Sequence, residues 1–277
     1  MLEKLIASAA IAVATAGCCC DGACCPGQKC ELPQKTDDGR AIVYAAYTGG
    51  EKIVEDGTFS QKIWETAPVY TLTRPTDWRS YYSKLTPDEL AKYGDGAVLE
   101  PATFRMLYDD KNLYLGFQLT DLEVKADGKA DQLAHFTLGD LVEIFIKPTF
   151  RDYYWEMYST PLGYKTAYEF KGPRTGADGN DKLQLDFKVF SKVDGETGDG
   201  KPDKGWSTLV VIPRASLAKY GDQFTGDGSW TLLIGRYNYL SSDYAKEELS
   251  AFPQITKVDF HSLGEYAAIK FLPPCKK

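Results

Sequence analysis

Cysteine is missing from the long central part of this chain of 277 residues, since none occurs between Cys30 and Cys275. A fold built from that part cannot depend on internal disulfide bonds. Histidine is also scarce, with His135 and His261 as the only two copies. No serine stands in the glycine-flanked turn that exposes a hydrolase nucleophile, so the sequence gives no support for a Ser–His–Asp triad.

Positive charge is in the minority. The chain has 32 Lys and Arg against 39 Asp and Glu, which gives a formal net charge of −7. A general nucleic-acid binder needs an excess of cationic side chains to meet phosphates, and docking on anionic lipid needs the same. The charge balance therefore argues against both classes. With 43% hydrophobic and 26% charged residues, the composition is typical of a soluble globular protein.

Long hydrophobic runs are absent apart from one, from Leu5 to Gly17, which is too short to span a bilayer as a helix. It follows a lysine and ends in small residues, which is the pattern of a secretory signal peptide. The segment from Thr15 to Cys18 resembles a bacterial lipobox, in which the cysteine is lipidated. We therefore expect residues 1–18 to direct export, with Cys18 as a candidate lipid anchor and the only link to a membrane. The mature protein would be an outer-membrane or cell-surface lipoprotein, or periplasmic or secreted.

Six of the seven cysteines gather near the N-terminus, at positions 18, 19, 20, 24, 25 and 30. In an oxidising compartment they predict surface disulfides, and a bond between Cys30 and Cys275 could join the two ends of the domain. The alternative is a soft-metal cluster on Cys24, Cys25 and Cys30, although no histidine lies near them. The cysteines and the polar stretch after them predict a tether over residues 19–40. Residues 41–277 then form the folded domain.

Helical signals are few. Thr86 followed by Pro87 and two acidic residues is a helix start, and the helix should end near Tyr93. The segment from Pro213 to Leu217 predicts one further turn. Neither is long enough to connect parallel strands.

Period-two alternation of apolar residues instead predicts about ten short strands. The clearest of them cover residues 103–108, 113–120, 141–147, 153–159, 164–171, 184–190, 206–212, 230–239 and 267–272. We expect an all-β fold, an antiparallel β-sandwich of jelly-roll or immunoglobulin type with one or two short helical turns.

Charged residues interrupt the apolar faces of four predicted strands. Glu143, Glu156, Arg105 and Arg236 each share a strand face with apolar or aromatic residues. If these strands are neighbours, the four side chains converge with Asn238 on one sheet surface. Two interpretations stay open, a structural ion-pair network or a cleft for a polar ligand. Arginine donors and glutamate acceptors suit the vicinal hydroxyls of a sugar.

Two carboxylates are also what a glycoside hydrolase needs, one as acid and one as base or nucleophile. Arginine partners would keep Glu143 and Glu156 ionised, however, and an ionised carboxylate cannot donate a proton. The pair therefore favours binding over catalysis.

Three aromatic residues, Trp78, Tyr81 and Tyr82, lie in one loop without the alternation that would bury them in a sheet. Either the short helix after Pro87 covers these rings or a ligand does. In the second case Trp78 is a platform on which a sugar stacks, worth about 1–2 kcal/mol of binding energy. Tyr81 or Tyr82 would then supply a hydroxyl.

Three successive segments, ATFRMLYDDKNLYLGFQLTD, GDLVEIFIKP and YYWEMYSTPLG, form the centre of a longer pattern. DGTFSQKIWETAPVYTL precedes them, and GWSTLVVIPRASL, WTLLIGRYNYL, EELSAFP and VDFHSLGEYAAIKFL follow. In order and spacing, from about Ile53 to Leu272, the chain resembles the family 9 carbohydrate-binding modules.

This resemblance implies a β-sandwich related to the haem-binding DOMON-type domains. Family members are often joined to xylanases and other glycoside hydrolases. They hold the reducing end of a β-glucan or xylan chain between two tryptophans, while Arg, Glu and Asn contact its hydroxyls. Trp78 is the best match for the first tryptophan, and Phe252 stands where the second would be. The binding residues expected on this basis are Trp78, Tyr81, Tyr82, Arg105, Glu143, Glu156, Arg236, Asn238 and Phe252.

The family also carries structural calcium, which takes carboxylate and carbonyl oxygens as ligands. Acidic residues occur in suitable turns at positions 109, 110, 121, 127 and 131. Turn aspartates more often cap backbone amides, so the sequence assigns no calcium ligand. Trp64, Trp206 and Trp230 are expected in the core.

We therefore expect an exported, non-catalytic carbohydrate-binding protein of carbohydrate catabolism. Its ligand would be an oligo- or polysaccharide of the β-glucan or xylan type, and a glycoside hydrolase is a candidate partner. One alternative is a glycoside hydrolase that uses Glu143 and Glu156. Another is a haem-binding electron carrier with axial ligands from Met106, Met157 or His135, although core packing is the simpler role for both methionines.

Overall fold

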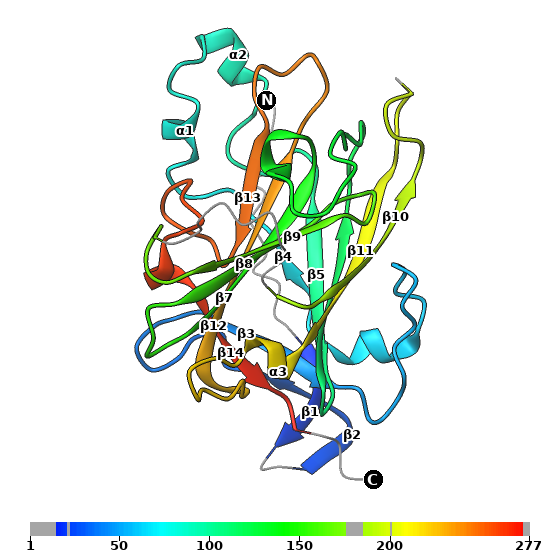
Figure 1. Ribbon diagram of the computed structural model, residues 1–277, viewed down its shortest axis with the longest axis vertical. Coiled ribbons are helices and arrows are strands. Elements are labelled where there is room, and N and C mark those ends of the chain that lie inside the picture. The colour runs from blue at the N-terminus through cyan, green and yellow to red at the C-terminus, as the bar shows by residue number, and fades with distance from the viewer. Residues whose placement is uncertain (1–14, 21–22, 176–184, 200, 274–277) are drawn as a thin grey trace, which may run out of the picture.

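The structure is a computed structural model that describes residues 15–20, 23–175, 185–199 and 201–273 (Figure 1). Most of the expected signal peptide and Cys275 lie outside the described residues. Strands β1 (Thr15–Cys20) and β2 (Ala23–Glu31) pair antiparallel in a small sheet of their own. Within the described ranges, no helix is long and apolar enough to cross a membrane.

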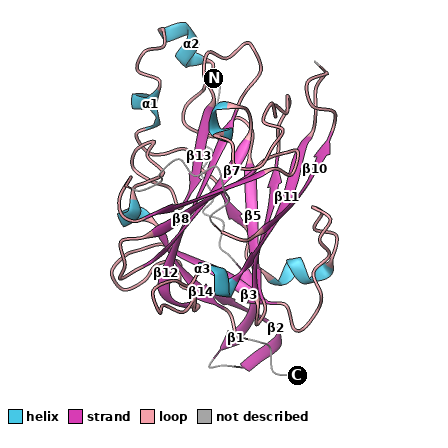
Figure 2. Ribbon diagram, viewed as in Figure 1, coloured by secondary structure: helices cyan, strands magenta, loops and turns pink. Residues whose placement is uncertain are grey.

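Twelve further strands form one sheet, and Figure 2 shows that strands dominate the molecule. The strands are β3 (Ile42–Tyr47), β4 (Tyr70–Thr71), β5 (Ala102–Tyr108), β6 (Asn112–Leu119), β7 (Leu141–Pro148), β8 (Tyr154–Ser159), β9 (Lys165–Phe170), β10 (Lys188–Asp194), β11 (Gly205–Pro213), β12 (Asp227–Asn238), β13 (Glu248–Phe252) and β14 (Ala267–Phe271). Their order is β10-β11-β6-β5-β3-β14-β12-β7-β8-β9, with β13 paired to β12 and β4 paired to β5. The expectation of an all-β fold is confirmed.

The sheet is mixed, so the expectation of purely antiparallel pairing is wrong. Strand β3 lies between β14 and β5 and runs parallel to both. Parallel neighbours need a long crossover connection. The sequence prediction excluded one because both predicted helical turns are short. Here the long irregular segment between β3 and β5 makes one crossover, and β14 reaches β3 from the far end of the chain.

The sheet curves until its two ends come together, which makes it nearly barrel-shaped. Hydroxyl groups join β8 to β10 and β11 at this seam. Ser159 Oγ lies 2.7 Å from Thr208 Oγ1, and Ser191 Oγ donates a hydrogen bond of 2.7 Å to the Thr160 carbonyl. The seam therefore closes through side chains where the backbone ladder ends.

Side chains on the inner face of the curved sheet form the main apolar core. On β7, for example, Val142, Ile144 and Ile146 point into this core, and each fully buried side chain of this kind contributes roughly 1.5–3 kcal/mol. The outer face of the sheet is also covered in two places. The segment after β3 packs on β5, β6 and β11, whereas the segment from Pro253 to Tyr266 packs on β7, β8 and β12. This second cover forms part of the wall of the candidate site.

Helical elements are short, as the sequence predicts. They are η1 (Lys62–Thr66), α1 (Trp78–Tyr81), α2 (Pro87–Ala91), η2 (His135–Thr137), α3 (Arg214–Leu217) and η3 (Leu263–Glu265). The predicted start at Thr86 is confirmed by a capping box, in which Glu89 N donates to Thr86 Oγ1 and Thr86 N donates to Glu89 Oε2. The predicted turn at α3 is also confirmed.

Candidate functional site

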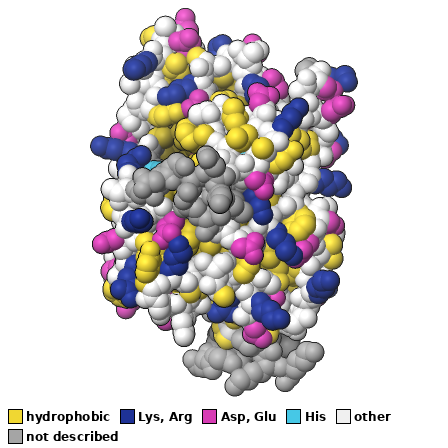
Figure 3. Space-filling view, viewed as in Figure 1, with side chains coloured by type: hydrophobic (Ala, Val, Ile, Leu, Met, Phe, Trp, Pro, Cys, Tyr) yellow, Lys and Arg dark blue, Asp and Glu magenta, His cyan; other side chains and the backbone are white. Residues whose placement is uncertain are grey.

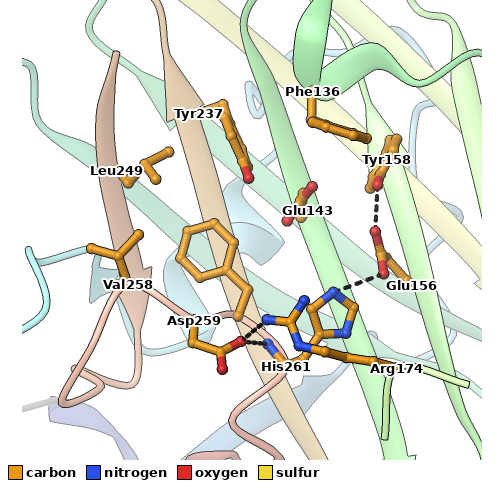
Figure 4. Close-up of a pocket in the computed structure, with 11 residues that line it drawn as sticks. Phe136, Glu143, Glu156, Tyr158, Arg174, Tyr237, Leu249, Val258, Asp259 and His261 are labelled. Carbon is orange, nitrogen blue, oxygen red and sulfur yellow. Dashed lines mark hydrogen bonds and ion pairs between the residues drawn. The ribbon is translucent and has the colours of Figure 1, made fainter. Parts of the chain in front are cut away.

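A cavity of about 220 Å³ lies on the outer face of β12, β7 and β8 (Figure 4). It is bounded on one side by η2 and on the other by the segment after β13. The lining residues are Phe136, Glu143, Glu156, Tyr158, Arg174, Tyr237, Leu249, Val258, Asp259, Phe260 and His261. Carboxyl groups and aromatic rings therefore share one small space.

Glu143 and Glu156 are brought together by the pairing of β7 with β8. Glu143 lies opposite Tyr158, and Phe145 lies opposite Glu156. Because successive strand residues alternate between faces, both glutamates point outward while their neighbours fill the inner core. Each is only 4% exposed. The sequence prediction that these two residues share a surface agrees with the structure.

The carboxyl group of Glu156 is held on one side only. Tyr158 donates its hydroxyl hydrogen to Oε1, whereas Oε2 is buried and accepts no hydrogen bond from the part of the chain that the structure describes. Nε2 of His261 lies 3.6 Å from this oxygen. Burial raises the pKa of Glu156 to about 7, because a charged carboxylate loses hydration there.

The pKa of Glu143 is also raised well above the usual range, first by burial and then by the charge of Glu156. Arg105 and Arg236 do not contribute to either shift. The expectation that these arginines keep both glutamates ionised is therefore wrong. The carboxyl pair instead retains protons to a higher pH than free glutamate would.

His261 is positioned by a chain of hydrogen bonds. Tyr154 accepts one from Arg174 N at 3.2 Å, and its hydroxyl lies 2.7 Å from Nδ1 of His261. A tyrosine hydroxyl that accepts from one amide can donate its own hydrogen to Nδ1, which leaves the ring hydrogen on Nε2 facing Glu156. Burial, reinforced by the charge of Arg174, lowers the pKa of His261 to about 4.

Arg174 and Asp259 join two loops across the mouth of the cavity. The guanidinium of Arg174 donates to Oδ1 of Asp259, and the His261 amide donates to the same oxygen at 3.0 Å. Both ionic side chains are partly exposed. The negative charge of Asp259 therefore balances the positive charge of Arg174 within the wall of the cavity.

Aromatic rings form the opposite wall. The centroid of Phe136 lies 6.5 Å from that of Tyr158 and 6.2 Å from that of Tyr237, which in turn lies 5.8 Å from Phe260. Phe136 is 37% exposed and stands at the rim. Figure 4 shows the carboxyl group of Glu143 among Phe136, Tyr158 and Tyr237.

Phe260 can approach the sheet because β12 has a glycine beneath it. A Cβ atom at Gly235 would lie 2.6 Å from the ring of Phe260, which is closer than atoms can pack. The absence of a side chain at this outward position lets the covering segment lie directly on the strand. Gly235 therefore helps to define the depth of the cavity wall.

Arg236 and Asn238 do not line the cavity, although they belong to the same strand as Tyr237. They face the interior, where Arg236 donates to the carbonyls of Glu100 and Thr120 at 2.6 and 2.7 Å. Arg236 also lies 3.3 Å from Asp121, whose pKa burial raises to about 6. Arg236 therefore belongs to a buried polar network, but its partners are Glu100, Asp121 and Asn238 and not the glutamates that the sequence placed with it.

Arg105 likewise lies away from the cavity. Its strand β5 belongs to the other half of the sheet, and Nη1 donates a hydrogen bond of 2.6 Å to the carbonyl of Trp64. Phe252 packs against Tyr70 and Phe104, with ring centroids 4.8 and 5.3 Å apart. The structure thus brings Glu143 and Glu156 together without these two residues.

Trp78 is 6% exposed and forms an apolar cluster with Tyr82, Tyr93 and Leu240. The guanidinium carbons of Arg74 and Arg79 lie 4.7 and 4.6 Å from its ring. Trp78 is therefore covered by its own chain, which is the first of the two alternatives for this loop.

The hydroxyl groups of Tyr81 and Tyr82 are both engaged within the protein. Tyr81 donates to the side chain of Glu247, and Tyr82 donates to the carbonyl of the same residue at 2.9 Å. Neither tyrosine lines the cavity.

The other sequence candidates are distributed through the fold. Trp64, Trp206 and Trp230 are buried in apolar clusters, which confirms their expected role. Met106 and Met157 are fully buried in the inner core, so core packing is confirmed for both. In the described part of the chain, no group of three or more His, Cys, Asp or Glu side chains is arranged to hold a metal.

Sequence reasoning missed most of the cavity wall. Two wall residues are indicated by strand alternation. Tyr158 lies two residues after Glu156, and Tyr237 lies two residues after Gly235, so each shares the outward face of its strand with that residue. Arg174, Asp259 and His261 come from loops far away in the chain, and no local pattern connects them with the glutamates.

No protein-family model matches the sequence, and no curated protein sequence matches it. Solved structures do match. A candidate carbohydrate-binding protein from Bacteroides uniformis has a TM-score of 0.59 at 14% identity, covering 83% of this chain and 99% of its own. A family 9 carbohydrate-binding module from Caldicellulosiruptor kristjanssonii, in complex with glucose, has a TM-score of 0.51 at 14% identity, covering 85% and 98%. The same kind of module from that organism in complex with cellotriose has a TM-score of 0.49 at 14% identity, covering 85% and 95%.

These likenesses extend over most of the chain. At 14% identity they show a shared fold, which is the fold of the family 9 modules that the sequence resembles. The fold alone does not assign a function, which has to be argued from the cavity.

Proposed function

We propose that this protein binds carbohydrate and that the outer-face cavity is its sugar site. The observation that carries this proposal is the placement of two buried carboxyl groups beside aromatic rings in one small cavity. Carboxyl oxygens accept hydrogen bonds from hydroxyl groups, while aromatic rings cover the apolar faces of a sugar ring. The shared fold with a module solved in complex with glucose supports the same function.

The mixed charges on one face of the molecule suit a neutral or weakly charged ligand. Figure 3 shows lysine, arginine and acidic side chains intermixed on the visible face, with hydrophobic side chains between them. A glycan carries no dense charge and does not need a surface of one sign.

A glycan of the β-glucan or xylan type follows from the sequence resemblance and is part of the proposal. So are export, a lipid anchor at Cys18, structural calcium and delivery of the glycan to a separate glycoside hydrolase. A binding protein held at the cell surface would concentrate substrate for such an enzyme.

A glycan screen followed by isothermal titration calorimetry tests the proposal. We expect at least one mono- or oligosaccharide to bind, and Glu143→Ala to weaken that binding by at least tenfold. Glu55→Gln is the matched control, since Glu55 forms an exposed ion pair with Lys188 and does not line the cavity. If no sugar binds at millimolar concentration, the proposal is wrong.

A glycoside hydrolase remains the second candidate, and one observation favours it. A hydrolase needs a carboxyl group that keeps its proton near neutral pH, and burial raises the pKa of Glu156 to about 7. Turnover of xylan or cello-oligosaccharides by the purified protein, abolished in Glu156→Gln, would establish catalysis. The absence of turnover together with binding would leave a binding protein.

A further inference from the structure

The two buried carboxyl groups of the cavity lack a cationic partner. Among the described residues, neither Glu143 nor Glu156 forms an ion pair with a lysine or arginine. Arg174 is the arginine that borders the cavity, and its guanidinium is bound to Asp259, although its charge offsets part of the rise in the pKa of Glu156. His261 lies beside Glu156 but stays uncharged because its pKa is lowered to about 4. The cavity therefore has an excess of acidic groups.

One oxygen of this pair is left without a hydrogen bond. Oε2 of Glu156 is buried and accepts no hydrogen bond from the described residues, and Glu156 as a whole is only 4% exposed. A buried acceptor without a partner destabilises the protein. A ligand that donates hydrogen to this oxygen would recover that energy on binding.

Aromatic rings also surround the carboxyl pair, and a ring with its face toward a bound cation would attract it. Phe136, Tyr158 and Tyr237 lie around Glu143 in Figure 4. The ring centroid of Phe136 is 6.5 Å from that of Tyr158 and 6.2 Å from that of Tyr237. The face of an aromatic ring attracts a cation, and this attraction grows where water is excluded. A neutral hydroxyl group gains none of it.

We propose that the cavity selects an amino sugar, with its ammonium group beside Glu143 and Glu156. This proposal rests on the carbohydrate binding proposed above, and it takes an amino sugar as the ligand in place of a neutral β-glucan or xylan unit. The ammonium would donate to the free oxygen of Glu156 and lie near the rings, while the sugar hydroxyls meet the remaining polar groups. The volume of about 220 Å³ is below the range of roughly 300–1,000 Å³ typical of larger ligand pockets, so a single sugar ring fits the proposal best.

Proton release distinguishes this mode of binding from that of a neutral sugar. The carboxyl pair holds a proton near neutral pH, because burial raises both pKa values and the charge of Glu156 raises the pKa of Glu143 further. An ammonium group bound there replaces that proton, which passes to the buffer. The titratable and charged side chains that face the pair are Tyr154, Tyr158, Tyr168, Tyr237, Tyr266, Arg174, Asp259 and His261.

Calorimetry with three monosaccharides tests the proposal. Glucosamine, N-acetylglucosamine and glucose are titrated at pH 6.5 in two buffers of different ionisation enthalpy. We expect glucosamine to bind at least tenfold more tightly than the other two, and to release a proton that glucose does not. Glucose binding as tightly as glucosamine would overturn the amino-sugar proposal while leaving carbohydrate binding intact. Failure of all three sugars would also overturn the amino-sugar proposal, whereas carbohydrate binding itself is decided by the glycan screen.

Two variants and a control complete the test. Glu143→Gln and Glu156→Gln should bind glucosamine no more tightly than glucose, because an amide lacks the negative charge that pairs with the ammonium group. Glu55→Gln should keep the preference. Thermal denaturation verifies that each variant is folded. If cyclohexylamine binds as well as glucosamine, the cavity recognises an ammonium group alone and the sugar part of the proposal is wrong.

Discussion

Nε2 of His261 lies 3.6 Å from Oε2 of Glu156. Free glutamate and free histidine would attract each other as ions over a range of weakly acidic pH. In this protein both side chains are neutral over much of that range. Burial lowers the pKa of His261 to about 4 and raises that of Glu156 to about 7. Between these values neither side chain is charged. The cavity thus presents a neutral imidazole and a protonated or shared-proton carboxyl pair to a ligand.

The raised pKa of Glu156 predicts that this residue destabilises the fold at high pH. Its stabilising contribution is complete below its unfolded pKa of 4.5 and is lost as the pH rises through about 7. Glu156→Gln should therefore be more stable than wild type at pH 8, by up to about 3 kcal/mol, and equal to it near pH 4.5. Urea unfolding at both pH values measures the difference. A variant that is less stable at pH 8 would show that the carboxylate is satisfied by a partner.

Trp78 should be important for stability and not for sugar binding. Its ring is buried between Arg74 and Arg79 and packs on Tyr82, so Trp78→Ala should cost about 3–5 kcal/mol. Thermal denaturation and sugar titration together check this. Tyr220→Ala is the control, because Tyr220 is 65% exposed and its loss should cost little. A stable Trp78→Ala variant with weakened sugar binding would instead assign Trp78 to the site.

The ion pair between Arg74 and Glu248 should stabilise the position of the segment between β4 and β5. The pair is buried, and Glu248 also accepts the amide hydrogen of Leu99 at 2.9 Å. Arg74→Met leaves the carboxylate without its cation and should cost about 3–5 kcal/mol. The double variant Arg74→Met/Glu248→Gln should recover part of this loss in denaturant unfolding. A double variant no more stable than the single one would argue against coupling of the two charges.

Gly235 should matter for ligand binding through the wall that it supports. A methyl group at this position meets the ring of Phe260, so Gly235→Ala should displace the covering segment and weaken sugar binding by about tenfold. Gly264→Ala, in the covering segment itself, is the matched control, since a Cβ there meets no atom within 4 Å. Equal sugar affinities of the two variants would show that the wall adjusts without cost.

Strand alternation predicted which residues of one strand share a face, and this was enough to pair Glu143 with Glu156. It could not predict how the faces of distant strands are oriented relative to each other. Arg236 shares its face with Ile234, but that face is the inner one, whereas the face of Glu143 is the outer one. A period of two fixes relative positions within a strand and leaves the choice of inward face to the tertiary fold.

The contribution of the covering loops to the cavity could not be predicted from the sequence, for a different reason. Both faces of β7 and β8 are buried, so apolar residues on the outer face do not distinguish a core from a covered site. The contacts of His261 with Tyr154 and Glu156 join positions about a hundred residues apart. Such contacts follow from the curvature of the whole sheet, which local propensity does not encode.

A crystal structure of the protein with the sugar that binds most tightly in the glycan screen tests the central claim most directly. We predict the sugar ring in the outer-face cavity, with polar groups within hydrogen-bond distance of Glu143 and Glu156 and an apolar face toward Phe136 or Tyr237. A sugar bound at the loop of Trp78, or anywhere else with the cavity empty, would contradict the assignment of the site.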